Sequence, residues 1–289
     1  MNILVTGANG QLGSEIKELA ANYKDSSFFF KDLPELDICN SNQLEVFFIE
    51  NKINTVINCA AYTAVDKAEE ESIIATKVNS EGVLNIVNAL NRVNGKLIHI
   101  STDYVFDGDH FLPYKESDSV SPIGVYGETK RLGELAVINS DIDAIVIRTS
   151  WLYSSYGNNF VKTMLRLGNE KENLGVIFDQ VGTPTYARDL AKACLEILSG
   201  FTSANINKNG NLYHYSNEGV ASWYDFAITA MELASINCHV HPIQTKDYPT
   251  KAKRPQYSVL NKSKIKADFK IEIPYWRDSL KDCIKKIKK

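Results

Sequence analysis

Short hydrophobic runs alternate along the first half of the chain with longer stretches that have helical spacing. The runs predict strands at 2–6, 26–31, 54–59, 96–101 and 143–148, and the stretches between them predict helices at 11–22, 41–51, 72–94 and 122–139. The hydrophobic residues at 3–5, 55–57, 97–100 and 144–147 are nearly continuous, as in strands that are covered on both faces. This repeated βα unit predicts an α/β fold with a doubly wound parallel sheet of the Rossmann type.

The pattern becomes less regular after Trp151. It predicts a helix near 158–168, a strand at 174–178, a helix at 187–199 and a strand at 212–216, while the polar segment 203–211 predicts a loop. We therefore expect a second, smaller α/β unit. The expected division gives residues 1–150 with 174–217 to the Rossmann domain, and residues 151–173 with 218–289 to a substrate domain.

Composition narrows the classes of partner and compartment. The 289 residues are 44% hydrophobic and carry a net charge of −3, so no basic field favours nucleic acid. No apolar run approaches the roughly 20 residues of a membrane span, and the first residues resemble a strand rather than a secretion signal. The five cysteines form no Cys-x-x-Cys pair. We expect a soluble cytoplasmic protein with no disulfide, no metal site and no membrane or nucleic-acid partner.

A glycine-rich loop follows the first predicted strand and opens the first predicted helix. Gly7, Gly10 and Gly13 have the spacing of a dinucleotide fingerprint, in which glycines allow a tight turn, close approach to a pyrophosphate and close helix packing. The helix N-terminus favours the anion. We predict that the loop binds NADPH or NADH, with Asn9, Gln11 and Leu12 as further cofactor residues.

The residues that follow the second strand bear on the choice between the two dinucleotides. Asp32 is placed to accept hydrogen bonds from the adenosine ribose, which favours NADH, whereas the neighbouring Lys31 would attract a 2′-phosphate, so the preference stays open. Asp37 and Ile38 are predicted to reach the adenine, although Asp37 has an alternative as a cap of the next helix.

Two small residues, Ala60 and Ala61, follow the third strand. We predict that they let the cofactor lie close to the end of the sheet. The alternative is that they serve only tight packing.

Three side chains further along the chain suggest carbonyl chemistry. Tyr126 and Lys130 lie one helical turn apart, and a nearby ammonium would lower the pKa of a phenol from about 10. Thr102 ends the fourth strand, at the sheet edge where doubly wound folds bind ligands, and its hydroxyl could bind a carbonyl. From the residues alone, this set predicts a ketone reductase.

The loop and these three residues, in this order, resemble the extended short-chain dehydrogenase/reductase family over essentially the whole chain. The resemblance implies that Tyr126 protonates the developing alkoxide, that Lys130 binds the nicotinamide ribose and tunes Tyr126, and that Thr102 orients the carbonyl. Sugar-nucleotide dehydratases of the family carry a glutamate after Thr-Asp. Here Tyr104 follows Asp103, which disfavours dehydration.

Five stretches narrow the resemblance to the dTDP-4-dehydrorhamnose reductases within that family: 63–69, 101–106, 148–151, 157–160 and 179–185. The reaction implied is NAD(P)H-dependent reduction of the 4-keto group of dTDP-4-dehydro-L-rhamnose to dTDP-L-rhamnose, a donor for cell-envelope polysaccharide. The expected partner is therefore a dTDP-sugar, and the expected assembly is a monomer or a homodimer.

The resemblance also implies substrate contacts. They are Val65, Asp66, Thr102, Asp103, Tyr126, Trp151, Asn159, Lys162 and Arg254. Five of them have simpler alternatives: a domain-interface residue for Trp151, helix caps for Asn159 and Asp66, a surface cation for Lys162, and an ordering salt bridge for Arg254.

Some family members hold magnesium between glutamates at a dimer contact. Glu15 fits one of these positions, but Arg188 stands where another carboxylate would belong, so we expect no such metal here. Two other functions remain open. A related reductase would give the epimeric talose product, and the regulatory subunit of methionine adenosyltransferase resembles these enzymes without being the catalyst.

Overall fold

The central sheet has six parallel strands in the order β10-β5-β4-β3-β1-β2. The computed structural model describes residues 1–200 and 211–288, so most of the predicted loop at 203–211 lies outside the described residues. The strands of this sheet are β1 (Asn2–Thr6), β2 (Ser27–Lys31), β3 (Thr55–Asn58), β4 (Lys96–Thr102), β5 (Asp143–Thr149) and β10 (Asn211–His214). The doubly wound parallel sheet is confirmed, and the strands predicted at 2–6, 26–31, 54–59, 96–101, 143–148 and 212–216 form in it with small differences at their ends, whereas the strand predicted at 174–178 lies outside it.

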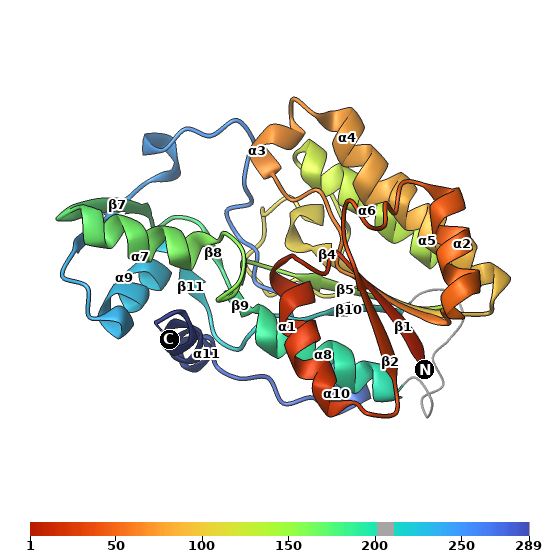
Figure 1. The fold of residues 1–289 in the computed structure, drawn as a ribbon. Coiled ribbons are helices and arrows are strands. Elements are labelled where there is room, and N and C mark those ends of the chain that lie inside the picture. The colour runs from red at the N-terminus through yellow and green to blue at the C-terminus, as the bar shows by residue number, and fades with distance from the viewer. Residues whose placement is uncertain (201–210, 289) are drawn as a thin grey trace.

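Helices cover both faces of this sheet (Figure 1). One face carries α1 (Gln11–Leu19), α8 (Ala187–Gly200) and α10 (Ser263–Phe269), and the other carries α2 (Ser41–Asn51), α5 (Gly82–Arg92) and α6 (Val125–Ile138). Alternate residues of each strand feed the two cores: Ile3 and Val5 pack towards α1 and α8, while Leu4 packs towards α2 and α5. Burial of both faces explains why the hydrophobic runs are continuous.

The crossover between β3 and β4 is less regular than the single helix predicted at 72–94. It consists of α3 (Val65–Ala68), α4 (Ser72–Thr76), a π-helical turn η2 (Lys77–Glu81) and then α5. Within that turn, the fully buried Asn79 accepts a hydrogen bond from the Tyr62 backbone N–H at 2.8 Å and donates to the Thr129 hydroxyl at 3.1 Å. A buried amide needs such partners, and here it ties the crossover to α6.

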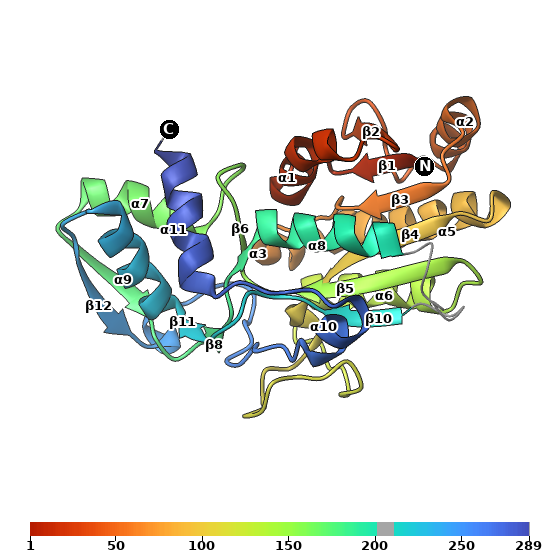
Figure 2. The ribbon, with the colours of Figure 1, turned by 90° about the horizontal axis from the view of Figure 1, so that it is seen from below.

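A smaller unit lies beside the carboxyl ends of the strands, and Figure 2 shows it to one side of the main sheet. Its helices are α7 (Phe160–Glu170), α9 (Trp223–Ala234) and α11 (Trp276–Ile287). Its strands pair two by two: β7 (Asn173–Ile177) with β12 (His239–Ile243), β8 (Val181–Gly182) with β11 (Ala221–Ser222), and β6 (Leu152–Tyr153) with β9 (Thr185–Tyr186). The short helices η1 (Ala20–Asn22), η3 (Asp103–Val105) and η4 (Thr245–Asp247) complete the described elements.

The division into two domains stays a prediction, and four elements depart from the residue ranges given for it: β7, β8, β9 and α10. Strands β8 and β9 fall in the range predicted for the Rossmann domain but pair with β11 and β6 of the smaller unit. Strand β7 pairs with β12 and not with the six-stranded sheet, because its buried residues Leu174 and Val176 pack against α7 and α9. Helix α10 instead joins the core under α1 and α8 through Ile265.

Candidate active site

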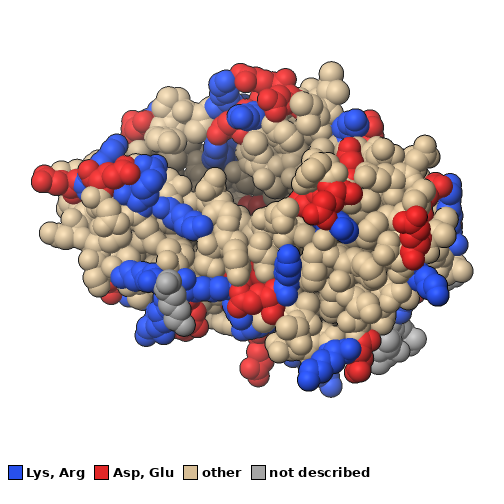
Figure 3. All heavy atoms as spheres, in the orientation of Figure 1, with Lys and Arg blue, Asp and Glu red and all other residues tan. Residues whose placement is uncertain are grey.

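A cavity of about 820 Å³ opens at the carboxyl ends of β1, β3 and β4. Figure 3 shows the surface hollowed between the two parts of the molecule, with acidic and basic side chains interspersed on this face. Of the predicted site residues, the cavity brings together Gly7, Gly10, Gln11, Leu12, Gly13, Asp32, Asp37, Ile38, Ala60, Ala61, Val65, Thr102, Asp103, Tyr126, Lys130, Trp151 and Asn159. Four predicted residues do not line it: Asn9, Asp66, Lys162 and Arg254.

The loop between β1 and α1 forms a cradle that only glycine permits at two positions. Gly7 has φ +61°, and a Cβ there would lie 2.7 Å from the Ala60 backbone nitrogen. A Cβ on Gly13 would collide with the Gly7 carbonyl oxygen. The first turn of an α-helix leaves backbone N–H groups without intrahelical partners, and Gln11 and Leu12 of this turn in α1 line the cavity. The cradle therefore fits a pyrophosphate.

Asp32 holds the loop as well as lining the cavity. Its Oδ2 accepts a hydrogen bond from the Asn9 backbone N–H at 2.9 Å, and its Oδ1 accepts one from the Leu33 N–H at 2.9 Å. Asn9 thus acts through its main chain. The Lys31 ammonium donates to Glu35 at 2.8 Å and is not among the residues lining the cavity.

The remaining residues predicted for the adenine side lie at the cavity wall. Asp37 accepts a hydrogen bond from the Cys39 N–H at 2.8 Å, whereas the N-cap of α2 is Asn40, whose side chain accepts from the Gln43 N–H at 3.1 Å. The alternative assignment of Asp37 as a helix cap was therefore wrong. Ile38 is buried beside it and lines the same wall.

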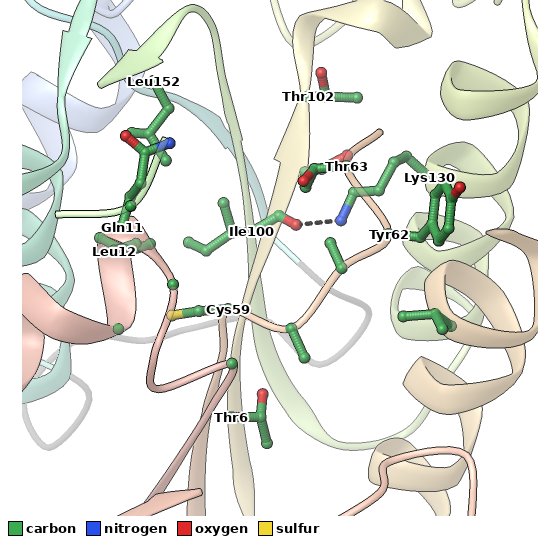
Figure 4. Close-up of a pocket in the computed structure, with 18 of the residues that line it drawn as sticks. Thr6, Gln11, Leu12, Cys59, Tyr62, Thr63, Ile100, Thr102, Lys130 and Leu152 are labelled. Atoms are coloured by element: carbon green, nitrogen blue, oxygen red, sulfur yellow. Dashed lines mark hydrogen bonds between the residues drawn. The ribbon is translucent and has the colours of Figure 1, made fainter. Parts of the chain in front are cut away.

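Tyr126, Lys130 and Thr102 meet at the opposite end of the cavity. Tyr126 lies in the first turn of α6, Lys130 one turn later, and Thr102 is the last residue of β4. The Lys130 ammonium donates a hydrogen bond to the Ile100 carbonyl oxygen at 2.6 Å, as Figure 4 shows. Burial lowers the pKa of Lys130 to about 8.

The structure does not show the lowered pKa of Tyr126 that we expected from a nearby Lys130 ammonium. Burial raises the pKa of Tyr126 to about 12, and a hydrogen bond with Thr102 only partly offsets that rise. The reason is geometric, because the Lys130 ammonium is directed at a main-chain carbonyl. The phenol is therefore protonated at neutral pH and is available as a proton donor.

Two neighbours of Thr102 complete this end of the site. Asp103 is only 2% exposed, and its Oδ1 accepts a hydrogen bond from the Thr102 hydroxyl at 3.0 Å. Burial raises the pKa of Asp103 to about 7. The Tyr104 ring contacts the Tyr126 ring edge-on, with centroids 5.4 Å apart. Sequence reasoning noted Tyr104 only for not being glutamate, and nothing in the pattern indicated this contact.

Trp151 and Asn159 bring the second unit to the cavity. Trp151 has φ +48° and stacks on Trp223 with ring centroids 3.6 Å apart. Asn159 caps α7 by accepting from the Lys162 N–H at 3.1 Å, and its amide also donates to the Gln11 side chain at 3.0 Å. The cap assignment is confirmed, and the same residue joins the phosphate loop to the second unit. Sequence reasoning missed Trp223, whose separation from Trp151 along the chain hides the stack.

Asp66 and Arg254 bind each other. Arg254 Nη2 donates to Asp66 Oδ2 at 2.7 Å and Nη1 donates to Oδ1 at 3.2 Å, so the ordering salt bridge considered for Arg254 is present. The cap assignment for Asp66 was wrong, because the N-cap of α3 is Ala64. Lys162 is not itself among the lining residues, but its ammonium donates at 2.9 Å to the carbonyl oxygen of Gly157, which does line the cavity.

Glu15 is fully buried and paired with cations. Its Oε2 lies 3.0 Å from Arg188 Nη1 and 3.0 Å from Lys286 Nζ. Within the described ranges, no group of three or more His, Cys, Asp or Glu side chains could hold a metal ion. In the same ranges, no helix combines the length and the apolar character that crossing a membrane requires.

Comparisons with known proteins agree with this architecture. A curated protein of Aggregatibacter actinomycetemcomitans named dTDP-4-dehydrorhamnose reductase is 41% identical over 286 residues, which cover 97% of each chain. A crystal structure of a dTDP-4-dehydrorhamnose reductase from Clostridium acetobutylicum superposes with a TM-score of 0.93 at 42% identity and covers 100% of both chains. A Bacillus anthracis dTDP-4-dehydrorhamnose reductase, solved in complex with NADP, superposes with a TM-score of 0.92 at 37% identity and covers 99% of both chains.

The family model described as the RmlD substrate binding domain matches residues 1–289. Together with relatives this similar over nearly their whole length, the match shows that the chain belongs to the family of the RmlD substrate binding domain.

Proposed function

We propose that this protein catalyses the NAD(P)H-dependent reduction of the 4-keto group of dTDP-4-dehydro-L-rhamnose to dTDP-L-rhamnose, for cell-envelope polysaccharide. The observation that carries the proposal is the single cavity in which the phosphate loop faces Thr102, Tyr126 and Lys130. The full-length similarity to dTDP-4-dehydrorhamnose reductases supports the choice of substrate.

The cofactor end of the cavity suits a pyridine dinucleotide. The backbone N–H groups at the start of α1 would bind its pyrophosphate, and Asp32 would accept hydrogen bonds from its adenosine ribose. When bound, the reduced nicotinamide supplies the hydride. Lys130, at the far end, would bind the nicotinamide ribose through its ammonium in addition to the Ile100 carbonyl.

The chain itself supplies the proton and orients the ketone. The pKa of Tyr126 is about 12, so its phenol holds a proton at pH 7 and can donate it to the oxygen that becomes the 4-hydroxyl. Thr102 lies beside Tyr126 and can donate a hydrogen bond to the same oxygen, which stabilises negative charge there in the transition state.

Substrate contacts are divided between the two units. Val65, Asp103, Trp151 and Asn159 line the cavity and are proposed to contact the dTDP-sugar. Arg254 is proposed to bind its diphosphate, but the guanidinium is held by Asp66 and would have to exchange that carboxylate for phosphate oxygens. Lys162, whose ammonium donates to the carbonyl oxygen of the cavity-lining Gly157, is proposed to contact the nucleotide from the cavity edge.

We also propose that the protein works in the cytoplasm as a monomer or homodimer without a nucleic-acid partner. Its five cysteines are all free thiols, which suits a reducing compartment. Light scattering of the purified protein would give the oligomeric state.

The decisive test is turnover of enzymatically prepared dTDP-4-dehydrorhamnose with NADPH and NADH in parallel, with the product identified by NMR. Oxidation of the cofactor coupled to dTDP-L-rhamnose is the expected result. Formation of the talose epimer would show that the hydride reaches the opposite face of the 4-keto group. Dinucleotide binding without oxidation would contradict the proposal and favour another ketosugar or a regulatory subunit.

A further inference from the structure

The Thr102 hydroxyl has three groups around it and only one proton. A hydroxyl offers one donor and two acceptor lone pairs. The Tyr104 backbone N–H donates to Thr102 Oγ1 at 3.2 Å and occupies one lone pair. Asp103 Oδ1 lies 3.0 Å from the same oxygen. The third group is the Tyr126 phenol, which forms a hydrogen bond with Thr102 on the cavity side. One proton and one lone pair therefore remain, to be shared between Asp103 and the cavity side, where Tyr126 and a bound ketone would lie.

The protonation of Asp103 decides how they are shared. An ionised carboxylate can only accept, so it takes the Thr102 proton in a charge-assisted hydrogen bond and leaves a lone pair towards the cavity. A protonated carboxyl can donate to Thr102 instead. The Thr102 proton is then free to point into the cavity, where a ketone oxygen needs a donor.

The surroundings of Asp103 allow both its protonated and its ionised form near neutral pH. The side chain is 2% exposed, and the titratable groups facing it are the phenols of Tyr104 and Tyr126. The Arg254 guanidinium interacts with the neighbouring Tyr104 but is paired with Asp66. Burial raises the pKa of Asp103 to about 7, although hydrogen bonds with Thr102 and Ser258 act in the opposite direction.

We propose that Asp103 is a positioning residue that sets the direction of the Thr102 hydroxyl, so that Thr102 donates to the substrate ketone only while Asp103 is protonated. The inference rests on the proposed reduction. Asp103 transfers no proton to the substrate in this scheme, because the proton of the new hydroxyl comes from Tyr126.

The test is the pH dependence of kcat in the unaltered protein and in Asp103→Asn. In the unaltered protein, kcat should fall above about pH 7 as Asp103 ionises. The loss of one donor to an oxyanion lowers kcat by about 10²- to 10³-fold, which bounds the fall. An asparagine does not titrate, so in either orientation of its amide the fall near pH 7 should disappear, and only a fall near pH 8 from Lys130 should remain.

Three further variants separate positioning from a general effect of charge. Asp109→Asn removes an exposed carboxylate from the same loop and should keep the profile of the unaltered protein. Thr102→Ser retains the hydroxyl and should keep the fall, whereas Thr102→Val should lose it together with most of kcat. A fall that persists unchanged in Asp103→Asn would overturn the inference.

A second measurement does not need activity. The pKa of Asp103 is raised from 3.8 to about 7 in the folded state, so the folded state binds the proton more tightly than the unfolded state. The stabilisation by the protonated group is complete below about pH 4 and is lost as pH rises to about 7. The free energy of unfolding of the unaltered protein, relative to Asp103→Asn, should therefore fall across that window.

The two measurements separate a failure of the inference about Asp103 from a failure of the proposed function. A stability difference that does not change with pH would show that Asp103 is ionised throughout, and would overturn the inference. The expected pH dependence of stability, without any ketosugar reduction, would contradict the proposed function while supporting the protonation of Asp103.

Discussion

Replacing Tyr126 with phenylalanine removes the proposed proton donor and little else. The Tyr126 ring contacts Tyr104 edge-on with centroids 5.4 Å apart, and a phenylalanine ring keeps that contact. The hydroxyl is lost together with its hydrogen bond to Thr102. Such a bond contributes about 1 kcal/mol to stability, which in a protein of this size lowers Tm by no more than about 4 °C.

The effect on turnover should be much larger. A positioned general acid contributes about 10²- to 10⁴-fold to the rate, which corresponds to about 2.7 to 5.5 kcal/mol of transition-state stabilisation. The phosphate loop and α1 lie at the other end of the cavity, as the positions of Gln11 and Lys130 in Figure 4 show. We therefore expect Tyr126→Phe to lose at least about 100-fold in kcat while its Kd for NADPH stays unchanged.

The assay measures kcat from the loss of cofactor absorbance and the Kd for NADPH from a fluorescence titration. Tyr104→Phe is the matched control, because it removes a phenol from the facing ring and should lose at most about tenfold in kcat. Normal turnover by Tyr126→Phe would refute the assignment of Tyr126 as the acid. Equal losses in both variants would point to disturbed packing of the two rings.

Three other substitutions probe the loop, the core and cofactor choice. Gly13→Ala should weaken NADPH binding by at least about tenfold, because its Cβ would collide with the Gly7 carbonyl, and an unchanged Kd in a fluorescence titration would contradict this. The buried Arg148 Nε lies 2.7 Å from Glu134 Oε1, and Glu134→Gln leaves this guanidinium without its anion. The substitution should lower the free energy of unfolding, measured with urea, by about 3 to 5 kcal/mol. A loss below about 1 kcal/mol would show that the pair is dispensable. Asp32→Asn should raise the ratio of kcat/KM for NADPH to that for NADH by about tenfold, because one carboxylate no longer repels a 2′-phosphate, and parallel kinetics with the two cofactors would check it.

The strands and helices of the Rossmann part could be predicted because their patterns are local. Buried parallel strands are hydrophobic at every position, and the sheet β10-β5-β4-β3-β1-β2 forms where such runs occur. The partner of β7 could not be predicted in this way. A short strand next to an irregular segment has no local signal for its neighbour, and packing against α7 and α9 decided it.

The candidate site likewise has features that local sequence predicts and features that depend on distant segments. The glycine loop, Tyr126 and Lys130 were placed from their spacing, and Thr102 from the end of a predicted strand, because the loop, the helical turn and the strand are each encoded within a few neighbouring residues. The stack of Trp151 on Trp223 joins segments far apart in the chain and is visible only in the structure.

The fold class, the position of the glycine loop and the chemical groups at the sheet edge could be worked out from the sequence, since each depends on a local pattern of residues. Tertiary structure alone decided what those groups face. It turned the Lys130 ammonium to the Ile100 carbonyl and paired Arg254 with Asp66. It also buried Asp103 against Thr102. Charge states and hydrogen-bond directions follow from burial and from neighbours distant in the chain, which no local pattern contains.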